Sequence, residues 1–144
     1  MDFFSSMDIS ASALSAERTR INLISSNLAN VNSTRTAEGG PYKRKDAVFS
    51  ATAAQKGSFG AALNQASQAR KVEVSQVRED QNPPRLQYEP SHPDADAAGY
   101  VAYPNINVVE EMTDMVSATR SYEANVTAAQ AAKAMALKTL ELGR

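Results

Sequence analysis

Residues 108–142 read VVEEMTDMVSATRSYEANVTAAQAAKAMALKTLEL and contain neither Gly nor Pro. Apolar residues recur there at three- and four-residue spacing, which predicts a long α-helix. They form two rows. The first row is Val109, Met112, Val116, Thr119, Val126, Leu137 and Leu140. The second row, at seven-residue spacing, is Met115, Tyr122, Ala129 and Ala136. Two rows make a stripe wider than one partner helix needs.

The ends of this helix carry start and stop signals. Asn107 can cap the first turn, with Glu110 in the capping-box position and Glu111 adding favourable charge near the helix N-terminus. Gly143 can end the helix. At about 1.5 Å per residue the helix would span roughly 50 Å, so we expect it to extend beyond any compact body.

A second helix is predicted for residues 4–30. Ser5 can cap it with Asp8 three residues on, and four residues at seven-residue spacing form its stripe: Met7, Leu14, Ile21 and Leu28. Ile24 and Val31 widen that stripe, and the Asn-rich segment 25–36 is typical of a helix exit. We expect this helix to pair with 108–142. The periodicity is equally compatible with a coiled coil and with ordinary packing of two helices in one globule.

The middle of the chain reads as short strands separated by turns. Strands are predicted at 42–49, 71–77, 85–89 and 99–103, with turns at 38–41 and 82–84. Residues 50–70 can form a short helix or a flexible loop. Lys43, Arg44 and Lys45 are interpreted as a solvated strand edge. The predicted fold is therefore mainly α with a small β insert, divided into 1–34, 35–104 and 105–144.

Composition limits what such a chain can do alone. Leu, Ile, Val and Phe provide only 26 of 144 residues, while Ala provides 25. Alanine favours helix but buries little area, so the burial that is missing has to come from partners. The net charge of −1 and the even spread of charge argue against nucleic-acid binding. No apolar run is long enough to cross a membrane, and the N-terminus lacks the pattern of a cleavable signal.

The sequence offers little that could catalyse a reaction. The single histidine, His92, precedes Pro93 and lies near Asp94 and Asp96, where a polar turn is favoured over a metal site or a hydrolytic triad. There is no cysteine, no nucleophile elbow and no phosphate-binding glycine loop. We therefore predict a protein that is not an enzyme and has no cofactor and no metal.

Four segments carry a family resemblance. They are ISSNLANVNS at 24–33, EGGPY at 38–42, GYVAYPNINVVEEM at 99–112 and RSYEANV at 120–126. In combination they resemble the bacterial flagellar basal-body rod family. The resemblance implies a structural subunit of the proximal rod, which serves motility. It would be exported by the flagellar type III apparatus and polymerised in the periplasm through paired terminal helices, giving a helical assembly.

The resemblance also implies partners. These are copies of the same chain, the rod proteins FlgB, FlgF and FlgG, the rod-base adaptor FliE and the export apparatus, with no nucleic acid and no insertion into a membrane. An alternative from a different class is a helical adaptor, or a module that binds the export apparatus, which recognises a partner through the C-terminal helix without polymerising.

Sixteen residues are expected at helix and subunit contacts. They are Leu14, Ile21, Ile24, Asn27, Leu28, Asn30, Met112, Met115, Val116, Tyr122, Glu123, Asn125, Val126, Ala129, Leu137 and Leu140. In this prediction the N-terminal stripe meets the C-terminal helix, and the second row packs against an adjacent subunit.

Overall fold

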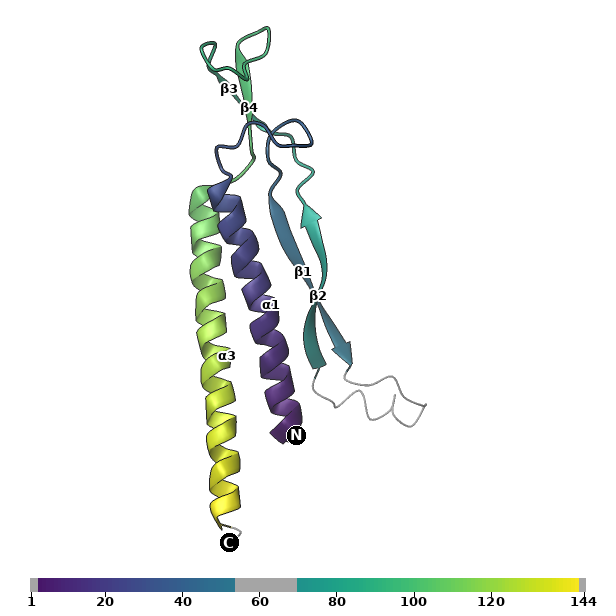
Figure 1. Cartoon of the computed structure of the whole chain (residues 1–144), viewed down its shortest axis with the longest axis vertical. Helices are drawn as coiled ribbons and strands as arrows, with labels where there is room; N and C mark the ends of the chain where they lie inside the picture. Colours follow the sequence, from purple (N-terminus) through teal and green to yellow (C-terminus); the bar gives the residue numbers. More distant parts are fainter. Residues whose placement is uncertain (1–2, 54–69, 143–144) are drawn as a thin grey trace.

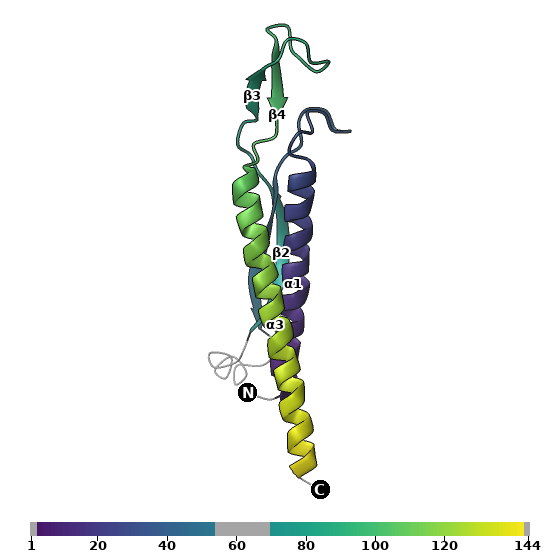
Figure 2. The ribbon, with the colours of Figure 1, turned by 90° about the vertical axis from the view of Figure 1, so that its left-hand side faces the viewer.

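The molecule is a long, narrow arrangement of two helices and two small sheets. The computed structural model describes residues 3–53 and 70–142. Its elements are α1 (Phe3–Ala29), β1 (Lys45–Ala53), β2 (Arg70–Glu79), β3 (Arg85–Tyr88), β4 (Tyr100–Tyr103) and α3 (Val108–Leu142). α1 packs against α3 on one side and against β1 and β2 on another, and β3 and β4 lie beyond one end of the helices (Figures 1 and 2). No described helix is long and apolar enough to cross a bilayer.

The C-terminal helix has the predicted bounds. The Asn107 side chain caps it, since Oδ1 accepts the Val109 N–H at 3.1 Å. Among the described residues Glu110 makes no return bond to Asn107, so the capping box is incomplete. The stop signal at Gly143 lies outside the described residues. Towards its C-terminus α3 continues past the start of α1 (Figure 1), as expected for a helix of this length.

The N-terminal helix differs from its prediction at one end. α1 is already helical at Phe3, so Ser5 lies within the helix and is not its cap. The exit is as predicted. α1 ends at Ala29, and Asn30 folds back on it through a side-chain amide that donates to the Ser26 carbonyl at 2.9 Å.

The β region consists of two separate antiparallel pairs. β1 pairs with β2 from Lys45↔Glu79 to Ala53↔Arg70, with a bulge between Val48 and Phe49. β3 pairs with β4 from Arg85↔Tyr103 to Tyr88↔Tyr100. All four predicted strands exist, but β1 starts three residues later than expected and continues to Ala53. The segment predicted as helix or loop at 50–70 therefore begins as strand, and 54–69 lie outside the described residues.

The β1–β2 sheet is attached to α1. A two-stranded sheet is marginal alone, so it needs such support. The Ser12 hydroxyl oxygen accepts the Val72 N–H at 3.2 Å, and Lys71 forms an ion pair with Asp8. α1 is thus the central element, with α3 on one side and the sheet on another.

The β3–β4 pair depends on one glycine. Gly99 adopts φ +82° immediately before β4, in the left-handed region that side chains rarely adopt. A Cβ at this position would lie 2.9 Å from the Tyr88 ring. The absence of a side chain therefore lets Tyr88 and Tyr100 meet edge to face, with ring centroids 5.4 Å apart.

The core is thin and rich in small residues. The buried apolar side chains of the described residues are Ala16, Ile24, Val101, Pro104, Ile106, Ala118 and Ala132. Three of these seven are alanines on the two helices, which allows the helix backbones to approach closely. The two-helix packing is thus observed, while its geometry as a coiled coil stays a prediction.

The structure places the second apolar row of α3 differently from its expected position. The second row (Met115, Tyr122, Ala129, Ala136) is half-buried on the side of α3 that packs on α1. The first row is mainly exposed, with Val109 and Leu140 at 72% and 71%. The expectation that the second row is free for another subunit is therefore wrong. The two alanines of the second row fit a close helix pair, and the row alternates along α3 with Glu111, Ala118, Asn125 and Ala132.

Candidate subunit interface

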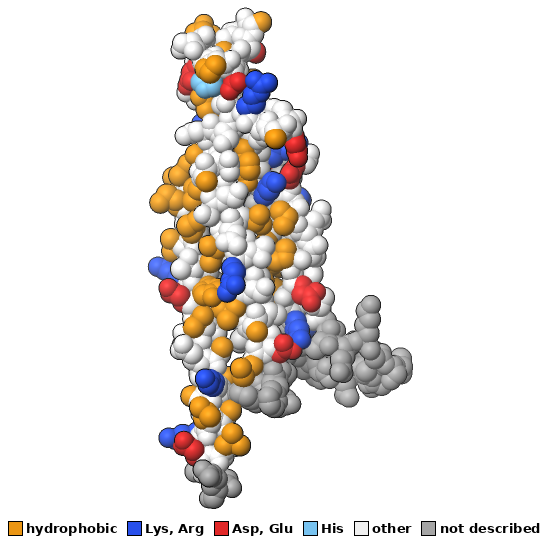
Figure 3. Space-filling view, viewed as in Figure 1, with side chains coloured by type: hydrophobic (Ala, Val, Ile, Leu, Met, Phe, Trp, Pro, Cys, Tyr) orange, Lys and Arg blue, Asp and Glu red, His pale blue; other side chains and the backbone are white. Residues whose placement is uncertain are grey.

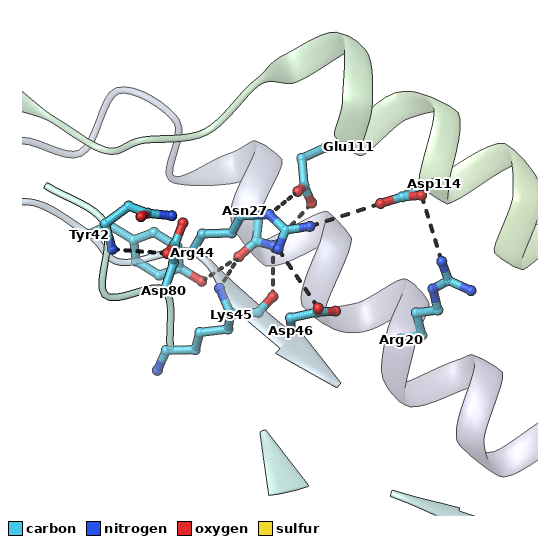
Figure 4. Close-up of polar contacts among 10 residues, drawn as sticks. Arg20, Asn27, Tyr42, Arg44, Lys45, Asp46, Asp80, Glu111 and Asp114 are labelled. Carbon is cyan, nitrogen blue, oxygen red and sulfur yellow. Dashed lines mark hydrogen bonds and ion pairs between the residues drawn. The ribbon is translucent and has the colours of Figure 1, made fainter. Parts of the chain in front are cut away.

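A buried polar cluster joins α1, α3 and the start of β1 near one end of the helix pair (Figure 4). Asn27 is fully buried at its centre. Its Nδ2 donates to the Lys45 carbonyl at 2.9 Å and to Glu111 Oε2 at 3.0 Å. Its Oδ1 accepts the Lys45 N–H at 2.9 Å and the Tyr42 hydroxyl at 3.1 Å. Both donors and both acceptor positions of the amide are used, so the side chain has a single orientation.

Glu111 is the second member of this cluster and is 1% exposed. Besides the bond from Asn27, its Oε1 accepts the Arg44 Nε–H at 2.6 Å. Arg44 also lies 3.9 Å from the carboxylates of Asp46 and Asp114. Burial lowers the pKa of Arg44, but the hydrogen bond and charge of Glu111, with those two carboxylates, outweigh this effect and raise it. The guanidinium is therefore a permanent partner for the buried carboxylate.

Two predictions change here. Arg44 is not part of a solvated strand edge, because its side chain packs against α3 at Glu111. Glu111 does lie in the first turn of α3, as predicted. Its carboxylate is also buried and paired with Arg44, 67 residues away in the sequence, and the sequence did not indicate this contact. We call this cluster the polar junction; it consists of Asn27, Tyr42, Arg44, Lys45 and Glu111.

Outside the polar junction, α3 carries an exposed apolar surface. Its members are Val109, Met112, Val116, Leu137 and Leu140, each more than half exposed. Met135 is also more than half exposed, but it lies about 160° around the helix axis from Leu137. Apolar side chains gather along the outer flank and the lower end of α3 in the space-filling view (Figure 3). This group, called the exposed row, is the main apolar surface that α3 presents outside its contact with α1.

The sixteen predicted contact residues fall into three groups. Ile24 and Asn27 are buried. Half-buried are Leu14, Ile21, Leu28, Asn30, Met115, Tyr122, Asn125, Val126 and Ala129. Exposed are Met112, Val116, Glu123, Leu137 and Leu140. The structure thus buries two of the sixteen residues, half-buries nine and leaves five on the surface.

Several contact residues were missed by the sequence reasoning. Glu111, Ala118 and Ala132 form part of a third row of α3 at seven-residue spacing, which includes Asn125. A search for large apolar residues passes over this row, although its spacing was visible. For Tyr42 and Arg44 no local pattern indicates a partner on a helix.

The loop between β3 and β4 is braced internally. His92 Nδ1 accepts the Asp94 N–H at 3.1 Å, which closes a turn. The Asp94 carboxylate accepts a hydrogen bond from the Thr34 hydroxyl at 2.8 Å and lies 3.8 Å from Arg35. Among the residues described, no group of three His, Asp or Glu side chains is placed to hold a metal ion.

Comparisons with known proteins agree with this organisation into two terminal helices around a β insert. Residues 7–35 match the family model for flagella basal body rod protein, and residues 97–142 match that for the C-terminal part of flagellar basal body rod FlgEFG proteins. Both ends of the chain thus have the features of flagellar basal-body rod proteins, the class predicted from the sequence motifs.

Relatives that are similar over the whole chain identify one family within this class of rod proteins. The FlgC rod protein of Bacillus subtilis is 45% identical, with 100% of each chain covered. That of Escherichia coli O6:H1 is also 45% identical, with 95% of each covered, and that of Aquifex aeolicus is 41% identical, with 98% of this chain and 97% of the relative covered. The chain belongs to the FlgC family of flagellar basal-body rod proteins. This membership confirms the predicted family and the predicted location in the basal-body rod. Its members are structural proteins and not enzymes.

Proposed function

We propose that this subunit polymerises into the proximal rod through the exposed row of α3. The observation that carries this proposal is the exposure of five large apolar side chains along one helix, from 51% for Val116 to 72% for Val109. Burying one such side chain fully is worth about 1.5–3 kcal/mol. A contact that covers the row would therefore supply the burial that the thin core lacks.

We propose an open assembly and not a closed pair. The exposed row occupies one flank of α3, and the half-buried row occupies the side towards α1. A neighbour that covers the row with a different surface makes a heterologous contact, and such contacts that do not close generate helical filaments. We propose other copies of this chain and the rod proteins FlgB, FlgF and FlgG as neighbours, with FliE at the rod base.

Export by the flagellar type III apparatus is the second part of the proposal. The interface between the helices is rich in alanine, and the described residues bury only seven apolar side chains, three of them alanines. A helix pair with so little buried area opens at low cost, which suits a subunit that passes through a channel before it assembles.

The test places one carboxylate on each of two exposed positions of α3. Val116→Asp puts a charge into the exposed row. Ala128→Asp adds the same charge at another exposed position, about 120° away around the helix axis at about 100° per residue. In cells that lack their own copy, we expect both variants to be exported. We expect only Ala128→Asp to restore basal bodies and swimming. Leu140→Asp should behave like Val116→Asp.

Two results would count against this proposal. Normal motility of both Val116→Asp and Leu140→Asp would remove the exposed row from assembly. The alternative, a non-polymerising adaptor, predicts that light scattering of the purified protein with other rod proteins saturates at a fixed stoichiometry. A rod subunit instead gives scattering that continues to rise with concentration.

A further inference from the structure

We infer that Asn27 and Glu111 are positioning residues for assembly, because they set the rotation of α3 about its own axis. That rotation decides which residues α3 presents to a neighbour. The inference rests on the proposed role of the exposed row, but it concerns a different contact, inside one subunit. Neither residue belongs to the exposed row, and both are almost completely buried.

The need for such residues follows from the rest of the helix interface. Three buried residues of the helix interface are alanines, namely Ala16 on α1 and Ala118 and Ala132 on α3. A methyl group fits many rotations and offsets of a neighbouring helix almost equally well, because apolar contact is not directional. Packing of this kind holds two helices together without specifying one face.

The polar junction supplies the missing direction. One oxygen of Glu111 is bonded from α1 by Asn27, and the other from the segment before β1 by Arg44. A turn of α3 by one residue position, about 100°, would carry this carboxylate away from both donors. The buried carboxylate would then lose both of its donors, and Asn27 and Arg44 would each lose the bond to Glu111, which is costly in a buried place. A single buried polar group fixes register in helical coils for the same reason.

An exposed ion pair one turn along provides a matched comparison. Asp114 lies 3.6 Å from Arg20 and 3.9 Å from Arg44, with 42% of its side chain exposed. It joins the same two helices, yet its partners remain hydrated if the helix turns. Asp114→Asn should therefore leave the rotation of α3 unchanged.

The chain contains no cysteine, so pairs of introduced cysteines can report the rotation directly. The helices run in opposite directions, and Arg20 faces Asp114. Ala16 and Ala118 therefore lie about one turn further along the same interface, and both are buried. Positions 117 and 119 point about 100° to either side of 118. We would join position 16 to 117, 118 or 119 with a short thiol cross-linker in the purified subunit.

In the otherwise unchanged chain we expect cross-linking of 16 to 118 to be about tenfold faster than of 16 to 117 or 119. Tenfold corresponds to about 1.4 kcal/mol. Glu111→Leu should reduce this preference to near onefold, and Asp114→Asn should retain it. Glu111→Gln keeps the size of the side chain but offers Arg44 an amide in place of a charge, and should give an intermediate preference. If Glu111→Leu does not fold by circular dichroism, Glu111→Gln decides the question.

An unchanged tenfold preference in folded Glu111→Leu, or in Glu111→Gln where only that variant folds, would overturn the inference. The proposed function fails separately. If Val116→Asp assembles normally, the exposed row is not the assembly surface, whatever the cross-linking shows. If both ideas hold, Glu111→Gln lowers the number of assembled rods without changing export, and Asp114→Asn lowers neither.

Discussion

The N-terminal third of α3 is attached to the rest of the molecule by directional contacts, whereas its C-terminal third is attached by small apolar ones. At the first end Asn107 caps the helix, Glu111 is bonded to two other segments and Ala118 is fully buried. Beyond Arg120, every side-chain hydrogen bond of the described residues stays within the helix. The difference indicates that the N-terminal end of α3 fixes how the helix is placed on α1, while the C-terminal end remains available to a neighbour.

The largest effect is expected from removing the centre of the polar junction. Asn27→Leu leaves the Lys45 N–H and carbonyl without partners and takes a donor from Glu111. Each unsatisfied group costs about 1–3 kcal/mol, so we expect a loss of at least ~3 kcal/mol in urea unfolding. Asn125→Ala is the control. Within the described part of the chain the Asn125 amide bonds only to Ser121 of its own helix, so its loss should cost less than ~1 kcal/mol. Equal losses would mean that the junction does not dominate stability.

Enlarging alanines compares the two ends of the helix directly. Ala118 is 0% exposed and Ala132 is 5% exposed. Overpacking a buried site costs about 1–3 kcal/mol. Ala118→Leu should reach that range, because the adjacent junction prevents α3 from moving away. Ala132→Leu should cost less, since its end of the helix can shift.

Ala131→Leu is the control for this pair. Ala131 is exposed, and its substitution should change the free energy of unfolding by no more than ~0.5 kcal/mol. Thermal or urea unfolding measures all three variants. A larger cost at 132 than at 118 would contradict the assignment of the firmly held end.

Amide exchange in dilute monomer should show the same gradient. We expect residues 111–118 to exchange at least about tenfold more slowly than residues 133–142, because local opening is easier where few contacts must break. Slow exchange throughout 5–30 and 108–142 would contradict a subunit whose helices are completed by its neighbours.

The smallest effect concerns Asp80, next to the polar junction. The bond from the Asn82 backbone N–H is the main cause that lowers the pKa of Asp80. Burial opposes it, and the Asn82 side chain, Arg44 and Arg78 add smaller lowering effects. A lowered pKa means stability that is present above the ordinary carboxyl pKa and lost as the pH falls through the folded value. Asp80→Asn should cost less than ~0.5 kcal/mol at neutral pH.

The difference between Asp80→Asn and the unchanged chain should disappear in acid, where the carboxyl is protonated in both the folded and the unfolded chain. Urea unfolding at a series of pH values measures it. A difference that persisted in acid would mean that the Asp80 charge is not its cause.

The sequence predicts the elements of this fold better than their contacts. The bounds of α3 follow from an uninterrupted helical period and the cap at Asn107, which are both local signals. The start of β1 was misplaced because Tyr42 reads as a strand residue, while in the structure its hydroxyl bonds to Asn27. That contact joins residues 15 positions apart and has no periodic signature.

The candidate interface shows the same limit more clearly. Both rows of α3 are visible in the sequence, but the second row, expected to meet an adjacent subunit, lies on the side towards α1. Periodicity identifies which residues share a face and does not identify the face that packs on α1. That choice depends on the bonds of Glu111, whose partner Arg44 reads locally as one more surface cation.

The opposite directions of the two helices have a practical consequence for spectroscopy. The start of α1 and the end of α3 lie towards one end of the molecule, and the loop between β3 and β4 lies at the other (Figure 1). A donor dye at Lys138 and an acceptor dye at Ala97 would thus be separated by most of the length of one subunit. Strong energy transfer between them would report the head of one copy meeting the tail of the next.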